Sequence, residues 1–217
     1  MIGRTLIKVC GITRTADAAV ALDIGADYLG VNCWPGSPRH VAPERRAALL
    51  REIPAEKRVA VTVNPSADEV AGLVKEGFAV VQAHYDPAEK ACDPSSLSSR
   101  IGRQRLWLAP RLADGAPWPA GLLELAAGFV HDAHDRKAFG GTGTRSDWKR
   151  YVALLHAHPG SLWVLAGGLS PDNVHSAVHD AGASCLDLNS GVELAPGLKS
   201  AAKLHEVRQR LHNNGQS

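Results

Sequence analysis

Short apolar segments recur along the chain, and each of them ends at Gly, Pro, Asn or a charged residue. They are rich in Val, Leu, Ile or Trp, which is the pattern of strands buried on both faces of a parallel sheet. Eight strands are therefore predicted. They cover residues 6–11, 27–33, 58–63, 78–84, 105–111, 128–133, 162–168 and 184–191.

Segments with apolar residues at helical spacing lie between these predicted strands. In the clearest one, Ser66 and Glu69 have the spacing of a capping box, and Gly77 ends the pattern. Another begins with Pro43, which suits the first turn of a helix. Helices are predicted over 13–26, 43–53, 66–77, 146–158, 170–182 and 198–211, and two weakly patterned, short ones near 95–103 and 119–126.

Strand alternates with helix eight times, which predicts an α/β protein with a (β/α)₈ barrel, the TIM-barrel fold. An open doubly wound sheet is the competing architecture, but it usually has fewer strands, and no GxGxxG motif follows the first segment. No linker or low-complexity block interrupts the pattern. We therefore expect a single barrel domain over residues 1–211, with 212–217 as a frayed tail.

Composition narrows the possible functions. The 217 residues are 45% apolar, which is enough for one large core, and the formal net charge is only +2. No basic run with interleaved aromatic residues is present, so we expect no nucleic-acid partner. No signal segment or membrane-spanning stretch is present, so we expect a cytoplasmic protein with no membrane association. The four cysteines are far apart and are expected to be free thiols.

Polar residues gather at the ends of the predicted strands, where the active site of such a barrel lies. Residues two apart on a strand share a face, so Lys8 shares one with Cys10, and Gln82 shares one with His84. The same holds for Asp132 with His134 and for Asp187 with Asn189. The strand-end candidates are Cys10, Asn32, Asn64, Gln82, His84, Arg111, Asp132, His134, Asp187, Asn189 and Ser190.

Three glycine-rich turns, 139–144, 166–170 and 189–193, follow the last three predicted strands. Such turns let backbone N–H groups converge on an anion, and barrel enzymes often hold a substrate phosphate near strands 7 and 8. Together they predict a phosphate site. Its candidate residues are Gly141, Thr142, Gly143, Gly167, Gly168, Asn189, Ser190 and Gly191.

Several motifs, taken together and in order, resemble the phosphoribosylanthranilate isomerase family of tryptophan biosynthesis. They are IKVCGIT (7–13), ADYLGVNCWPGSPRHV (26–41), VAVTVNPS (59–66), VVQAH (80–84), FGGTGTRSDW (139–148), LAGGLSPDNV (165–174) and LDLNSGVELAPGLK (186–199). The resemblance implies a (β/α)₈ barrel that acts as an aldose–ketose isomerase, an intramolecular oxidoreductase. The reaction is the Amadori rearrangement of N-(5'-phosphoribosyl)anthranilate to 1-(o-carboxyphenylamino)-1-deoxyribulose 5-phosphate. It implies a small phosphosugar substrate, no metal or organic cofactor, and a monomer or homodimer.

The resemblance also implies residue roles. Cys10 is expected to be the general base and Asp132 the general acid, with Asp135 as the alternative acid. Arg39 is expected to pair with the anthranilate carboxylate. Lys8, Gln82, His84 and Asp187 are expected to contact substrate, with Asp187 at the ribose hydroxyls.

Both catalytic groups need shifted pKa values for these roles. Lys8 is expected to lower the pKa of the Cys10 thiol, unless it only pairs with a carboxylate inside the barrel. Asp132 must instead keep its proton near neutral pH, which burial or a nearby carboxylate would favour. The Trp34 side chain is expected either in the core or against the anthranilate ring.

Five residues depart from the family pattern, and we expect them at the rim of the pocket. They are Asn32, Cys33, Ala83, Tyr85 and Asn189. An ordinary isomerase, a divergent paralogue isomerising or epimerising another sugar phosphate, and an inactive barrel all fit these changes. The segment HDAHD (131–135) and His84 offer His and Asp side chains that could bind a metal ion, so a metal-dependent hydrolase is a further alternative.

Overall fold

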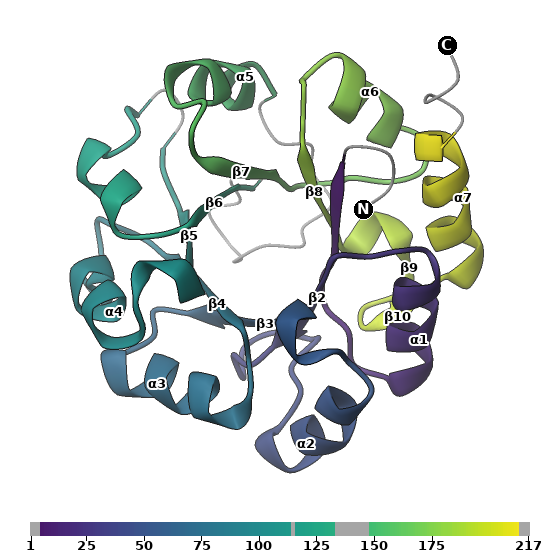
Figure 1. Ribbon diagram of the computed structural model, residues 1–217, viewed down its shortest axis with the longest axis horizontal. Helices are drawn as coiled ribbons and strands as arrows, with labels where there is room; N and C mark the ends of the chain where they lie inside the picture. The colour runs from purple at the N-terminus through teal and green to yellow at the C-terminus, as the bar shows by residue number, and fades with distance from the viewer. Residues whose placement is uncertain (1–4, 114–115, 133–147, 213–217) are drawn as a thin grey trace.

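The computed structural model describes residues 5–113, 116–132 and 148–212, and it contains a closed barrel of parallel strands in the order β1 to β8. β8 pairs with β1, for example Lys8 with Asp187, so the sheet has no free edge. Figure 1 shows the strands around one axis with the helices outside them. The strands are β1 (Leu6–Val9), β2 (Tyr28–Asn32), β3 (Arg58–Val63), β4 (Val80–Tyr85), β5 (Leu106–Pro110), β6 (Gly128–His131), β7 (Leu162–Leu165) and β8 (Cys185–Leu188). The predicted (β/α)₈ fold is confirmed.

The helices follow the predicted order and ring the barrel. They are α1 (Thr15–Asp23), α2 (Pro43–Arg51), α3 (Ala67–Glu76), α4 (Pro94–Ile101), α5 (Trp148–Ala157), α6 (Val174–His179) and α7 (Ala201–His212). The capping box of α3 is present, because Ser66 accepts from the backbone of Glu69 and Glu69 accepts from that of Ser66. Gly77 ends this helix in the left-handed conformation, at φ +105°.

The observed helices are shorter than the sequence pattern predicts, and three differences stand out. The segment near 119–126 forms only a 3₁₀ helix (Ala120–Glu124), and it contains Gly121, a residue that disfavours an α-helix. α6 begins only at Val174, because the side chain of Asn173 bonds to the backbone of Ser170 and Gly168 and forms a local turn there. α7 includes His212, one residue beyond the predicted end of the barrel, and residues 213–217 lie outside the described part.

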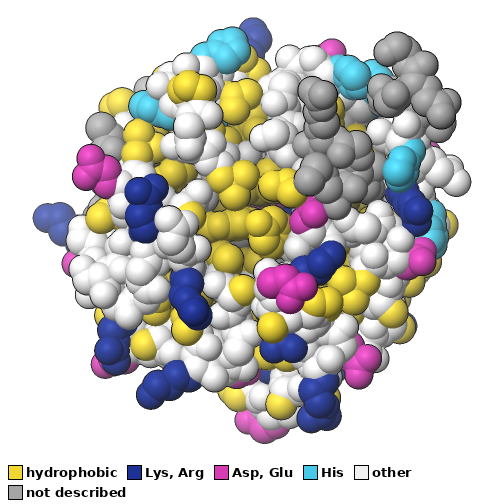
Figure 2. All heavy atoms as spheres, in the orientation of Figure 1, with side chains coloured by type: hydrophobic (Ala, Val, Ile, Leu, Met, Phe, Trp, Pro, Cys, Tyr) yellow, Lys and Arg dark blue, Asp and Glu magenta, His cyan; other side chains and the backbone are white. Residues whose placement is uncertain are grey.

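Two apolar cores hold the barrel. The larger one lies between the strands and the helices, and the smaller one fills the barrel interior with side chains such as Val59, Trp107 and Val164. Gly128 gives Trp107 its room, since a Cβ there would lie 2.8 Å from the indole. In the view down the barrel, hydrophobic side chains occupy the centre of the visible face (Figure 2). The interior is therefore packed rather than open, and polar residues are left to one end of it.

A short antiparallel hairpin follows β8, and the sequence pattern did not predict it. It consists of β9 (Glu193–Ala195) and β10 (Leu198–Lys199), which come after a 3₁₀ turn (Ser190–Val192) and lead into α7.

No helix in the described ranges is long and apolar enough to cross a membrane. All four cysteines are free, as predicted.

Candidate active site

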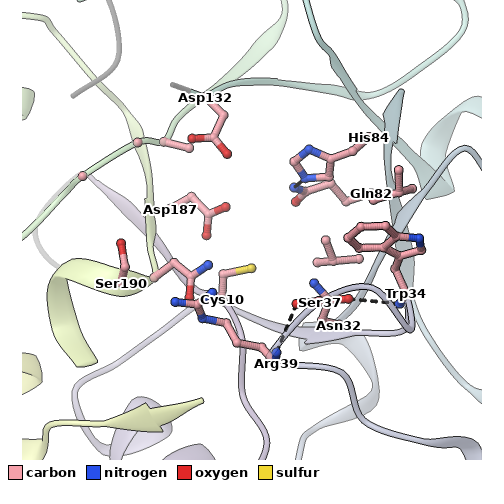
Figure 3. A pocket seen from close by; sticks show the side chains of 16 residues that line it. Cys10, Asn32, Trp34, Ser37, Arg39, Gln82, His84, Asp132, Asp187 and Ser190 are labelled. Atoms are coloured by element: carbon pink, nitrogen blue, oxygen red, sulfur yellow. Dashed lines mark hydrogen bonds between the residues drawn. The ribbon is translucent and has the colours of Figure 1, made fainter. Parts of the chain in front are cut away.

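A cleft that is open to solvent lies at the C-terminal ends of the strands. This is where the fold predicts the active site. Figure 3 shows side chains from several strands and from the loop after β2 converging on it. The lining residues are Cys10, Asn32, Trp34, Ser37, Arg39, Val61, Val63, Gln82, His84, Asp132, Ala166, Gly167, Gly168, Asp187, Asn189 and Ser190.

Cys10 comes directly after β1 and presents its sulfur to the cleft (Figure 3). Its backbone N–H donates to the carbonyl of Leu188 at 2.8 Å, which extends the pairing of β1 with β8. The residue is only 6% exposed, and a Cβ at Gly30 on the neighbouring strand would lie 3.0 Å from the sulfur. Glycine at that position therefore leaves the room that the thiol occupies.

Lys8 is completely buried inside the barrel and pairs with Asp187, with 2.8 Å between Nζ and Oδ2. A buried ammonium needs such a partner to offset its desolvation. Burial alone would lower the pKa of Lys8. Asp187 and Cys10 outweigh this effect and raise the pKa above its usual value, so the lysine stays charged. Asp187 Oδ1 is buried and has no hydrogen-bond partner among the described residues. It is therefore an available acceptor at the cleft.

The net shift of the Cys10 pKa is opposite to the expected one. Burial raises the pKa of the thiol, and the attraction and hydrogen bond of Lys8, together with the charge of Lys199, offset only part of this rise. Asp187 adds to the rise because its negative charge opposes a second one nearby. Lys8 thus lowers the pKa of the Cys10 thiol, as expected, and also pairs with a carboxylate inside the barrel, which was the alternative, but burial outweighs its effect on the thiol.

A pH titration tests this shift. Because its pKa is raised, Cys10 should stay protonated at neutral pH, and its thiolate should form only above about pH 8.5, the usual midpoint for a free cysteine. The measurement is thiolate absorbance near 240 nm against pH, taken as the difference between wild type and Cys10→Ser so that the other cysteines cancel. A midpoint near pH 7 would contradict the shift and would show that the nearby lysines outweigh burial.

Gln82 and His84 lie side by side on the inner face of β4, with 2.8 Å between the amide nitrogen and His84 Nε2. Burial lowers the pKa of His84 to about 4, and the charge of Lys8 adds to this, so the ring is neutral near pH 7. With the amide nitrogen as donor, Nε2 is the acceptor and Nδ1 carries the proton. Gln82 Oε1 is buried and makes no hydrogen bond to any described residue. The pair therefore presents polar groups suited to hydroxyls.

The loop after β2 supplies the wall opposite Asp187. The side chain of Asn32 accepts from the backbone N–H of Trp34 at 3.0 Å, and the Ser37 hydroxyl accepts from that of Arg39 at 3.1 Å (Figure 3). A Cβ at Gly36 would overlap the Trp34 indole. Trp34 lines the cleft and belongs to neither buried core, so of its two predicted positions the structure shows the one at the site.

Arg39 reaches the cleft from the same loop, and its guanidinium is paired with a carboxylate. Its Nε and Nη2 donate to the carboxylate of Glu193 on the hairpin, at 2.9 Å to Oε1 and 2.6 Å to Oε2. The predicted cation is thus present at the site, held by a carboxylate 154 positions away in the sequence. Glu193 lies within the motif at 186–199, but no pattern in the sequence indicates that it pairs with Arg39.

Asp132 follows β6 and lines the cleft from the side away from Arg39 (Figure 3). Gly167, Gly168, Asn189 and Ser190 line the same cleft, as a phosphate site requires. The remaining candidates Gly141, Thr142 and Gly143, and also His134 and Asp135, lie outside the described residues.

Gly191 is a candidate phosphate residue that does not line the cleft. A Cβ there would overlap the carbonyl of Leu169, so glycine is needed for the close approach of two loops.

The described residues contain no group of three or more His, Cys, Asp or Glu that could hold a metal ion.

Three of the five departures from the family pattern do not lie at the cleft. Ala83 and Tyr85 alternate with Gln82 and His84 on β4 and are buried in the core between strands and helices, against which Cys33 also packs. Their predicted place at the pocket rim is wrong, because side chains one residue apart on a strand point to opposite faces. Only Asn32 and Asn189 line the cleft.

Comparison with known proteins decides the family. The family model described as N-(5'-phosphoribosyl)anthranilate (PRA) isomerase matches residues 7–210. The chain belongs to the PRA isomerase family. A PRA isomerase from Bordetella pertussis is 39% identical over 213 residues, which is 94% of each chain.

Solved structures agree with this family. That of phosphoribosyl anthranilate isomerase from Thermus thermophilus has a TM-score of 0.80 and 32% identity, over 96% of this chain and 99% of the other. A PRA isomerase solved with reduced 1-(o-carboxyphenylamino)-1-deoxyribulose 5-phosphate has a TM-score of 0.71 and 24% identity, over 96% of this chain and 99% of the other, and supports the fold alone.

Proposed function

We propose that this PRA isomerase family member converts N-(5'-phosphoribosyl)anthranilate into 1-(o-carboxyphenylamino)-1-deoxyribulose 5-phosphate in tryptophan biosynthesis. One observation carries the proposal beyond family membership: Cys10, after β1, and Asp132, after β6, line one cleft that also contains the Arg39 cation. The reaction needs an acid, a base and recognition of two anions. The cleft offers each of these from a different part of the barrel.

Asp132 acts as the acid and Cys10 as the base. Asp132 donates a proton to the furanose ring oxygen while the bond from C1 to that oxygen breaks, and the anilino nitrogen stabilises C1 as a Schiff base. The thiolate of Cys10 then removes the proton on C2, and the electron pair returns to nitrogen to give an enolamine. Tautomerisation of the enolamine gives the ketone. Removal of the C2 proton uses the fraction of Cys10 that is thiolate. This fraction is small at neutral pH because burial raises the pKa of the thiol, and the charges of Lys8 and Lys199 increase the fraction.

The remaining cleft residues suit the rest of the substrate. Arg39 binds the anthranilate carboxylate, since a guanidinium matches a carboxylate in geometry, and the Trp34 indole packs against the aromatic ring. Asp187 Oδ1 accepts hydrogen bonds from the ribose hydroxyls, and the Gln82–His84 pair both accepts from them and donates to them. The backbone of Gly167 and Gly168 and the residues Asn189 and Ser190 bind the phosphate, together with residues 141–143. We expect no cofactor.

A second hypothesis is an isomerase or epimerase for another phosphosugar. It is favoured by the two departures that line the cleft, Asn32 and Asn189. Turnover and binding separate the two hypotheses. The purified chain should consume N-(5'-phosphoribosyl)anthranilate, followed by anthranilate fluorescence, and should restore growth of a tryptophan auxotroph lacking this step. Binding of sugar phosphates without either result would favour the paralogue.

A further inference from the structure

Glu193 lies at the centre of a buried ion cluster beside the cleft. Its carboxylate accepts from Arg39 as described above, from Lys199 Nζ at 2.7 Å and from the backbone N–H of Gly197 at 3.1 Å. Burial alone raises the pKa of Glu193, but the hydrogen bonds and charges of Arg39 and Lys199 lower it below the usual range. Glu193 is therefore an ionised carboxylate that pairs with two cations at once.

The cluster keeps a net charge of +1, because two cations share one carboxylate. Glu193 thus orients Arg39 without cancelling the positive charge that an anionic substrate group needs. Arg39 uses only Nε and Nη2 on Glu193, so the rest of its guanidinium fork is available to the cleft that it lines. A long side chain fixed in advance loses less entropy when it binds a carboxylate.

Backbone packing shows how tightly this arrangement is confined. Gly11, directly after Cys10, has φ +72°, and a Cβ there would lie 2.6 Å from Arg39 Cδ and 2.8 Å from Asn189 Oδ1. Lys199 Nζ donates to that same Asn189 oxygen at 3.0 Å. The stem of Arg39 therefore packs against the chain next to the proposed base, while Glu193 holds its head.

We propose that Glu193 is a positioning residue for the substrate's carboxylate, acting through Arg39 and not on the reacting atoms. This rests on the proposed function. Since the carboxylate of the anthranilate ring does not react, its contacts are expected to be equally strong in the ground state and the transition state. Loss of the positioning should therefore raise KM and leave kcat nearly unchanged.

Glu193→Gln tests the proposal because it keeps the size of the side chain and removes its charge. We expect KM to rise about tenfold or more, the size of effect typical of one charged hydrogen bond. Glu206→Gln is the matched control, since Glu206 forms an exposed pair with Arg210 far from the cleft-lining residues in sequence, and its substitution should change neither constant. Glu193→Asp is a second variant that keeps the charge inside the cluster but withdraws it from Arg39, and it should give a smaller rise.

Two binding probes separate positioning from general damage. Reduced 1-(o-carboxyphenylamino)-1-deoxyribulose 5-phosphate should bind about tenfold more weakly to Glu193→Gln, whereas its counterpart without the carboxyl group should bind as it does to wild type. In an Arg39→Leu background, Glu193→Gln should add nothing further for the carboxylated probe. Equal weakening of both probes, a full additional effect without Arg39, or a fall in kcat at constant KM would overturn the proposal. Failure of the proposed function would appear instead in the wild type, which would not turn over the substrate.

Discussion

Replacing Cys10 with Ala is expected to lower kcat for N-(5'-phosphoribosyl)anthranilate by about 10²–10⁴-fold, the usual contribution of a positioned general base. The methyl group of Ala cannot accept the C2 proton, and no other described side chain at the end of β1 takes the place of the thiol. The measurement is steady-state fluorescence of the anthranilate group. KM should change little, because Cys10 acts on the reacting carbon and is not proposed to bind the carboxylate or the phosphate.

The variant should remain folded, since Cys10 lies at the cleft and its removal leaves a space that water can enter. Thermal unfolding of Cys10→Ala should therefore resemble that of wild type. Cys33→Ala is the matched control, because that thiol packs against the core outside the barrel and not at the cleft. Full activity of Cys10→Ala would disprove the role of the thiol as base, whereas equal losses in both variants would point to damage unrelated to the site.

The strands were predictable because their chemistry is local. The segment 58–63 coincides with β3, and the other predicted strands overlap the observed ones, since a strand buried on both faces must be apolar along its length. The placement of Ala83 and Tyr85 was predictable too, from the same alternation that pairs Gln82 with His84. If Gln82 and His84 face the cleft, the residues between and after them must face the helices.

Contacts between distant residues were not predictable in the same way. Lys8 meets Asp187 across 179 positions and Arg39 meets Glu193 across 154, and both pairs exist only because β8 closes the barrel against β1. The Cys10 pKa depends on the same closure, since burial in the closed barrel outweighs a lysine that sequence spacing alone places nearby. A motif can identify such residues, but the sign of a pKa shift requires the surrounding structure.

Replacing Asp132 with Asn should lower kcat by about 10²–10⁴-fold, because an amide cannot donate the proton that opens the furanose ring. Asn keeps the size and polarity of the side chain, so substrate affinity and folding should change little. Asp135→Asn is the matched comparison, since both residues are candidates for the acid from the sequence. The structure places Asp132 in the cleft, and we expect only its substitution to abolish activity.

The kinetic isotope effect of deuterium at C2 distinguishes ring opening, assigned to Asp132, from removal of the C2 proton, assigned to Cys10. If Asp132 opens the ring, then Asp132→Asn makes ring opening limiting, and substrate deuterated at C2 should react as fast as ordinary substrate. In Cys10→Ala, removal of the C2 proton is limiting, so any residual turnover should slow with deuterium. An isotope effect that grows in Asp132→Asn would instead place Asp132 in the proton transfer at C2, and a loss of activity confined to Asp135→Asn would transfer the role of the acid to that residue.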